Sequence, residues 1–127
     1  MPTDRGKLTA FPTIHKGVAG YAYRVVFTRS YRAPNGERIP ANFNGLEAEL
    51  KIYSANKQGP PLINLATTPT NPNLFFTLNG ADRVALTWFM SSAEVAALTW
   101  KQGWAELALL EGPNRWRWLE GKVVVDD

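Results

Sequence analysis

Apolar and polar side chains alternate with a period of two along most of this chain, which is the pattern of β-strands that bury one face. Residues 21–28 (YAYRVVFT) show it clearly, with one side formed by Tyr21, Tyr23, Val25 and Phe27. Residues 46–53 (LEAELKIY) alternate as strictly, although Leu, Glu, Ala and Lys are good helix formers. A helix would spread these apolar residues around its whole surface, so we predict a strand there.

Further strands follow the same pattern, separated by turns rich in Gly, Pro and Asn. We predict them near residues 12–15, 62–67, 74–79, 83–90, 104–110, 115–119 and 122–125. A loop of about four or five residues is expected to join 104–110 to 115–119, and Gly121 is expected to mark a bulge. The predicted core residues are Leu46, Leu50, Ile52, Val84, Leu86, Trp88, Leu107 and Leu109.

One segment has helical signals. Ser91, followed three residues later by Glu94, forms a capping box before a short apolar run, and it predicts one short helix near residues 92–98. Together these elements predict an all-β fold, an antiparallel β-sandwich of Ig-like or jelly-roll-like type. We expect residues 1–127 to form it as a single domain.

A loop at residues 29–45 interrupts the strand pattern. Its Pro34-Asn35-Gly36 step is a strong turn signal, so the loop is expected to protrude as a hairpin. The loop carries Arg29, Tyr31, Arg32 and Arg38. A basic and aromatic excursion of this kind is typical of a protein-contact arm, although an ordinary solvated loop has the same composition.

Two tryptophans near the C-terminus alternate with arginines. Trp116 and Trp118 are expected to face the core, with Arg115 and Arg117 in solvent. The alternative is an exposed interface or stacking platform, because Trp and Arg are typical hot-spot residues. Both tryptophans are therefore candidate interface residues together with those of the loop.

Composition weakens the case for an enzyme. The chain has no Cys and one His, His15, so nucleophile–base pairs and nitrogen-rich metal sites have few groups to use. Glu47 and Glu49 resemble a carboxylate pair, but nothing in the sequence supplies a partner, and we interpret them as a solvated strand face. We predict no catalytic residues, no cofactor and no metal.

Charge is distributed unevenly. Residues 1–40 carry seven Lys and Arg against two Asp and Glu, a net charge of +5, whereas residues 41–127 carry seven against nine. No cluster of basic residues or RNA-binding signature accompanies this, so nucleic acid is not an expected partner. No apolar stretch approaches the ~20 residues of a membrane helix, and the N-terminus has no signal-peptide pattern, so we expect no membrane contact.

From residue 44 onward, the order of strands and turns resembles small β-sandwich virion proteins of tailed bacteriophages. It is similar to the N-terminal domain family of phage baseplate upper proteins. The resemblance lies in residues 44–48 (NGLEA), 83–86 (RVAL), 91–98 (SSAEVAAL), 104–107 (WAEL) and 119–125 (LEGKVVV).

This resemblance implies a non-enzymatic structural protein of the virion. A tail, baseplate or fibre-attachment adaptor is expected, made in the bacterial host cytoplasm and present in several copies in a symmetric assembly. Its partners would be other virion proteins. The alternatives are a capsid decoration protein and, from another class, a carbohydrate-binding β-sandwich module with Trp116 and Trp118 as stacking platforms.

Overall fold

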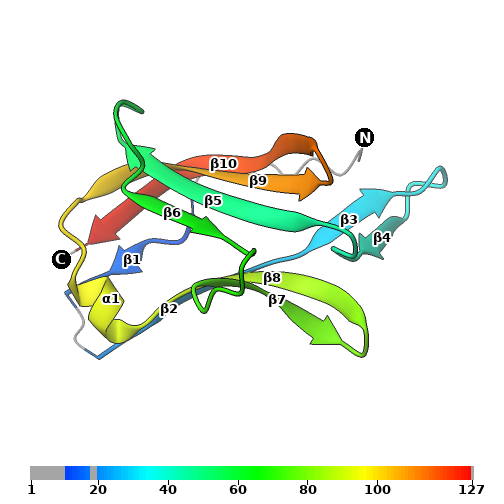
Figure 1. The fold of residues 1–127 in the computed structure, drawn as a ribbon, viewed down its shortest axis with the longest axis horizontal. Coiled ribbons are helices and arrows are strands. Elements are labelled where there is room, and N and C mark those ends of the chain that lie inside the picture. The colour runs from blue at the N-terminus through cyan, green and yellow to red at the C-terminus, as the bar shows by residue number, and fades with distance from the viewer. Residues whose placement is uncertain (1–10, 18–19, 127) are drawn as a thin grey trace.

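Two β-sheets pack face to face, and a two-stranded hairpin projects from one end of the pair (Figure 1). The structure is a computed structural model that describes residues 11–17 and 20–126. Strands dominate it and one short helix accompanies them, which confirms the predicted all-β sandwich.

The larger sheet has five strands. Their order is β1 (Ile14–His15), β10 (Asn114–Asp126), β9 (Gln102–Glu111), β5 (Glu47–Ser54) and β6 (Ile63–Ala66). Neighbours run antiparallel except β1, which pairs parallel to the end of β10. The alternation of β5 decided its structure against its helix propensity, because that register buries Ala48, Leu50 and Ile52 completely or nearly so.

The smaller sheet has three strands in the order β2 (Tyr23–Phe27), β8 (Asp82–Met90) and β7 (Leu74–Asn79). One residue after β2, the chain enters the projecting hairpin, formed by β3 (Arg29–Arg32) and β4 (Arg38–Ala41). The predicted loop is therefore a hairpin, and it extends the β2 side of the smaller sheet.

The core lies between the sheets, and seven of the eight predicted core residues are buried in it. At its centre the Trp88 ring meets the Tyr23 ring edge-on, with centroids 4.9 Å apart, and the Phe11 ring at 6.1 Å. The confirmed residues are Leu46, Leu50, Ile52, Leu86, Trp88, Leu107 and Leu109.

Val84 is the exception, since its side chain is 36% exposed. Thr77 pairs with Ala85, but the next residue of β7, Leu78, pairs with Arg83. Val84 is therefore the extra residue of a bulge, and strict alternation through it predicted the wrong face. The prediction for Tyr21 is also wrong: it precedes β2, after Gly20 at φ 84°, and is 67% exposed.

The β9–β10 hairpin differs from its prediction at two places. Its loop is the two residues Gly112 and Pro113, because Glu111 pairs with Asn114. The first residue of this tight turn needs a positive φ, and Gly112 adopts φ 56° there. Proline cannot adopt a positive φ, so it takes the second position. The bulge lies at Trp118 instead of Gly121, which pairs regularly with Ala105.

The helix α1 spans Ser92–Ala96, and its capping box is formed as predicted. The Ser91 hydroxyl accepts from the Glu94 N–H at 3.1 Å, and the Glu94 carboxylate accepts from the Ser91 N–H at 2.8 Å. The helix ends before residue 98. The N–H of Ala97 is shared between the carbonyls of Ala93 and Glu94, and the N–H of Leu98 donates three residues back to Val95 at 3.2 Å, as in the tightening of a last turn.

Candidate protein-contact hairpin

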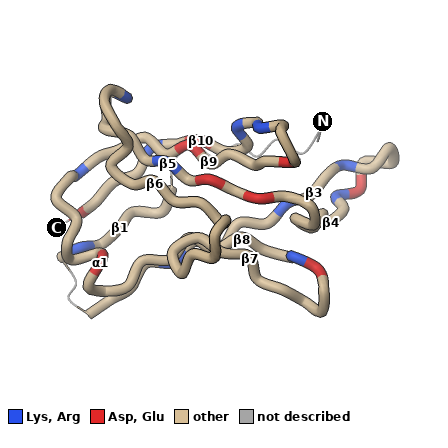
Figure 2. The backbone as a smooth tube through the Cα atoms, viewed as in Figure 1, with Lys and Arg blue, Asp and Glu red and all other residues tan. Residues whose placement is uncertain are grey.

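The β3–β4 hairpin is a ribbon with two chemically different faces. Ser30 pairs with Pro40, Tyr31 with Ile39 and Arg32 with Arg38. Directly opposed residues share a face and successive residues alternate, so Tyr31 and Ile39 lie on one face and Arg32 and Arg38 on the other. Figure 2 shows the basic positions gathered on this hairpin.

The tip of the hairpin is held by its own backbone. The N–H of Ala33 donates to the Glu37 carbonyl at 2.8 Å, and the N–H of Gly36 donates to the Ala33 carbonyl at 2.9 Å. The Asn35 side chain accepts from the Glu37 N–H at 2.9 Å. Gly36 has φ 85°, a conformation that glycine adopts freely, so the turn predicted from Pro34-Asn35-Gly36 is confirmed.

On the basic face, two arginines stand directly opposite each other. The Arg32 guanidinium donates to the Gly36 carbonyl at 2.7 Å, and the Arg38 guanidinium donates to the Ser30 hydroxyl at 3.2 Å. Neither forms an ion pair with a described residue. Like charges directly opposite in an antiparallel pair are destabilising, so this face has charge that the described part of the chain leaves uncompensated.

On the other face, Tyr31 is 42% exposed and its partner Ile39 is half-buried. Tyr31 was predicted as a contact residue and Ile39 was not. The pairing across the turn is the signal that identifies Ile39, because a turn centred on Pro34-Asn35-Gly36 sets the register of the strands on either side.

Arg29 has a different place from the other two arginines. It lies at the root of the hairpin, with its guanidinium carbon 5.6 Å from the centroid of the Phe43 ring. It also donates to the Asn42 carbonyl. Phe43 is completely buried, so Arg29 caps the edge of the core and helps to hold the ribbon against the sandwich.

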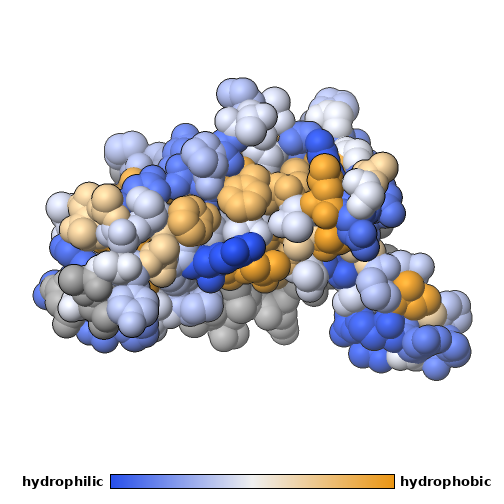
Figure 3. Space-filling view, turned by 90° about the horizontal axis from the view of Figure 1, so that it is seen from below, coloured by the Kyte–Doolittle hydropathy of each residue, from blue (hydrophilic) through white to orange (hydrophobic). Residues whose placement is uncertain are grey.

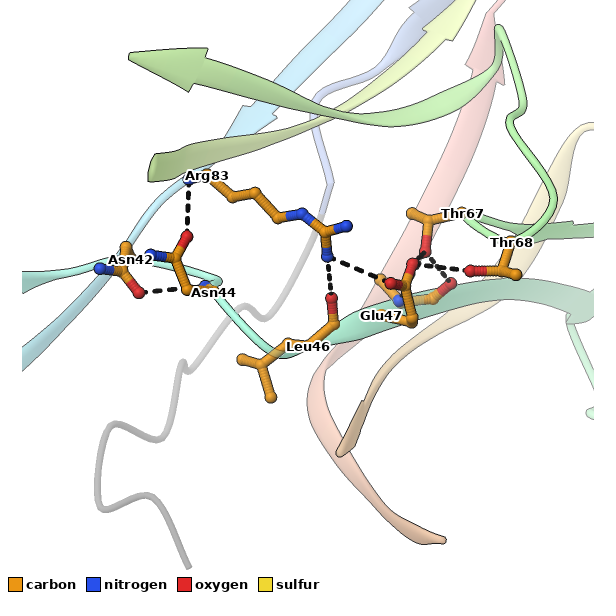
Figure 4. Close-up of polar contacts among 8 residues, drawn as sticks. Asn42, Asn44, Leu46, Glu47, Thr67, Thr68 and Arg83 are labelled. Atoms are coloured by element: carbon orange, nitrogen blue, oxygen red, sulfur yellow. Dashed lines mark hydrogen bonds and ion pairs between the residues drawn. The ribbon is translucent and has the colours of Figure 1, made fainter. Parts of the chain in front are cut away.

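A polar network fixes the return of the hairpin into the core (Figure 4). Asn44 accepts from the N–H of Arg83 and donates to Asp82, both at 2.8 Å. The N–H of Phe43 donates to the Arg83 carbonyl, also at 2.8 Å. These bonds join the segment after β4 to the start of β8.

Arg83 continues this network to the larger sheet. Its guanidinium donates to the Leu46 carbonyl at 2.5 Å and to the Glu47 carboxylate at 3.1 Å. Burial alone would raise the pKa of Glu47, but hydrogen bonds from Thr68, Thr67 and Arg83 outweigh burial and lower that pKa. The network therefore ties the two sheets together at the end where the hairpin begins.

The two predicted tryptophans belong to the core side of β10. Trp118 is 6% exposed and meets the rings of Phe27 and Phe43 edge-on, whereas Trp116 is half-buried against the core cluster. As predicted, Arg115 and Arg117 lie on the solvent side. The bulge turns Trp118 and Leu119 inward together, which confirms the expectation that Trp118 faces the core. The alternative, an exposed interface or stacking platform, is wrong for Trp118.

The charged groups of the larger sheet pair with one another. Arg115 pairs with Glu49, and Arg117 lies 2.5 Å from Glu120 and 3.5 Å from Glu106. Glu47 and Glu49 are therefore two separately paired carboxylates on a strand face. Among the described residues, no group of three His, Asp or Glu is placed to hold a metal ion.

Comparison with known proteins adds no family: no protein-family model and no curated protein matches the chain. No helix within residues 11–17 and 20–126 is long and apolar enough to cross a membrane.

Proposed function

We propose that this protein is a non-enzymatic structural component of a bacteriophage particle, where it acts as a tail, baseplate or fibre-attachment adaptor. The β3–β4 hairpin is its contact arm. The partner is another virion protein with an acidic surface, and several copies are arranged by the symmetry of the particle.

The observation that carries the contact role is the opposed pair Arg32 and Arg38 on a ribbon outside the sandwich. Holding two like charges across a ladder costs stability, and a carboxylate-bearing partner removes that cost. Arginine also suits planar carboxylates because its guanidinium donates in a fixed fork. The anchored root keeps the ribbon in place before the partner arrives.

The particle assignment is supported by the resemblance of residues 44–125 to small phage β-sandwich proteins. The carbohydrate-binding alternative depended on Trp116 and Trp118 as exposed platforms. With Trp118 buried, that alternative has lost the pair of rings on which it rested.

The test replaces Arg32 and Arg38 together by Ser. We expect the isolated double variant to keep its free energy of unfolding within ~1 kcal/mol of wild type, as for surface sites. Its amount in purified particles should fall strongly, measured by band intensity. Wild-type incorporation should decrease with added salt, and the remaining incorporation of the variant should depend less on salt.

The control removes an exposed cation from the larger sheet, Lys122→Ser. This variant should be incorporated like wild type. Equal incorporation of the arginine double variant at every salt concentration contradicts the contact role of the hairpin. Absence of the wild-type chain from purified particles contradicts the particle assignment itself.

A further inference from the structure

The open edges of the two sheets differ in how they are protected. An edge strand presents backbone N–H and C=O groups that can pair with another chain, and proteins guard it with charges, proline, bulges or short length. The free side of β10 has charged residues and the bulge at Trp118. At the other edge of that sheet, β6 has four residues and lies between Pro61 and Pro69. β2 carries Arg24, and the β3–β4 hairpin carries arginines and Pro40.

Strand β7 is an edge of the smaller sheet and has none of these devices. Its sequence, LFFTLN, contains no charged residue and no proline, and it lies in an uncharged run from residue 58 to residue 81. The extra residue of the β7–β8 bulge belongs to β8, so β7 itself is regular. Among the described strands β7 pairs with β8 alone, and no loop of the described chain forms a backbone hydrogen bond with residues 74–79.

One hydrogen bond identifies the backbone groups that β7 leaves free. The N–H of Phe89 donates to the Asn73 carbonyl at 2.8 Å, so this carbonyl points toward β8. Successive residues of a strand direct their backbone groups to opposite sides, so the odd-numbered residues of β7 bond to β8 and the even-numbered ones point to the free edge. Of these, Leu74 is completely buried. The N–H and C=O groups of Phe76 and Leu78 therefore remain for pairing.

Leu78 adds an exposed apolar side chain to the same edge. It lies on the side of β7 that Leu74 and Phe76 direct toward the core, because alternate residues of a regular strand share a face. The turn end of the β7–β8 hairpin bends away from the larger sheet (Figure 1), and Leu78 is 61% exposed there. A strand added along β7 brings another side chain against Leu78.

The free edge of β7 is complementary to itself. When two copies of β7 pair antiparallel about a two-fold axis at Thr77, Phe76 of each copy lies opposite Leu78 of the other. Each of these two pairs exchanges both of its N–H···O=C bonds, so every free backbone group of the edge is used. The two Thr77 side chains meet on the opposite face, which is a favourable cross-strand pair. No like charges oppose each other, since β7 has no charged residue.

We propose that β7 is a dimerisation edge, at which a second copy of this chain adds its own β7 and joins the two three-stranded sheets into one continuous sheet. Such a contact is closed, because both copies use the same edge. The β3–β4 hairpin continues β2 at the opposite edge of the smaller sheet, and it stands clear beyond one end of the molecule (Figure 3). The hairpin of each copy therefore remains free for another protein.

The absence of cysteine from the chain gives a direct test. Thr77→Cys places the two thiols at a non-hydrogen-bonded pair on the axis, where Cα atoms lie ~4.5 Å apart, within the range of a disulfide. Under mild oxidation the isolated variant should form covalent dimers on a non-reducing gel. Asn79→Cys is the matched control, since Asn79 is also exposed and on the same side of β7. Its two copies lie ~14 Å apart in this register, so dimers should form at least about tenfold more slowly.

Leu78→Lys tests the contact in the chain without cysteine. Sedimentation of the wild type should show a monomer–dimer equilibrium with a dissociation constant below about 1 mM, as for a small transient interface. Lysine at position 78 should raise this constant about tenfold or more, because a charged side chain on an edge strand opposes pairing. Leu62→Lys replaces a leucine that is 42% exposed and lies outside β7, and it should leave the constant unchanged.

Three outcomes overturn the inference. Cross-linking of Asn79→Cys as fast as that of Thr77→Cys indicates random collision or another register. A wild type that stays monomeric up to about 1 mM excludes a second copy as the occupant of the edge. Dimers that persist unchanged in Leu78→Lys use another surface. Each of these measurements uses the isolated protein, so their failure leaves the proposed function, which incorporation into particles tests, unaffected.

Discussion

Thr87 is a polar residue at an apolar, buried site, where its hydroxyl makes no hydrogen bond with a described residue. It is completely buried in the middle strand of the smaller sheet, between Val26 and Phe75 on the neighbouring strands. Its Oγ1 has no hydrogen-bond partner among the described residues. A buried hydroxyl that lost its water without gaining a partner lowers the stability of the folded state.

Thr87→Val should therefore raise the free energy of unfolding by ~1 kcal/mol, because valine keeps the shape and removes the orphaned hydroxyl. Urea unfolding at neutral pH measures this. Thr77→Val is the matched control: Thr77 lies on the same sheet but is exposed, so the change there should be close to zero. A loss of stability in Thr87→Val would mean that the hydroxyl has a partner, such as a bound water.

At the scale of elements, two bulges decide which side chains reach the core. The bulge at Val84 leaves that residue at the surface, while Leu86, two positions on, is completely buried. Beyond the bulge Arg83 takes the inward side, where its guanidinium carbon lies 4.7 Å from the centroid of the Phe76 ring. The bulge therefore aims the residue that ties the sheets together, as bulges often do near strand ends.

Leu86→Ala should lower the free energy of unfolding by ~2–5 kcal/mol, because it opens a cavity at a completely buried site. Val84→Ala should change it by less than ~1 kcal/mol, although regular alternation would place both residues on one face. Chemical unfolding of both variants gives the comparison. Similar losses in the two variants would contradict the bulge.

At the scale of the whole molecule, the Arg83–Glu47 contact joins the sheets at the base of the hairpin, and its strength depends on pH. The pKa of Glu47 in the folded protein lies below its ordinary value of 4.5. Glu47 therefore contributes stability above that ordinary value. The contribution is lost as the pH falls through the lowered folded value, because the folded state must then accept a proton at a site that favours the carboxylate.

Unfolding free energies measured from about pH 7 to about pH 3 should show this loss in the wild type. Glu47→Gln should be less stable at neutral pH and should lose less stability on acidification. Glu37→Gln, which removes an exposed carboxylate at the hairpin tip, should follow the wild-type curve. The hypothesis fails if Glu47→Gln and wild type lose stability equally across that range.

Local features of the sequence determined much of this protein. The period of two made residues 47–54 a strand despite their helix propensity, since only that register buries Ala48, Leu50 and Ile52 together. Pro34-Asn35-Gly36 determined the turn of the contact hairpin, and Ser91 with Glu94 determined where the helix starts. The turn and the helix start depend on interactions within a few residues, so a short stretch of sequence contains their cause. The strand is predictable for a different reason: its alternation shows which side chains the rest of the fold will bury.

Tertiary structure alone decided where an extra residue enters a strand and what lies opposite each side chain. Val84 leaves the expected core face, and Leu119 joins Trp118 in the core, because pairing with a neighbouring strand sets the bulge position and nothing within either strand specifies it. The three arginines of the hairpin look alike in sequence, yet packing on Phe43 makes Arg29 part of the root and leaves Arg32 and Arg38 for contact.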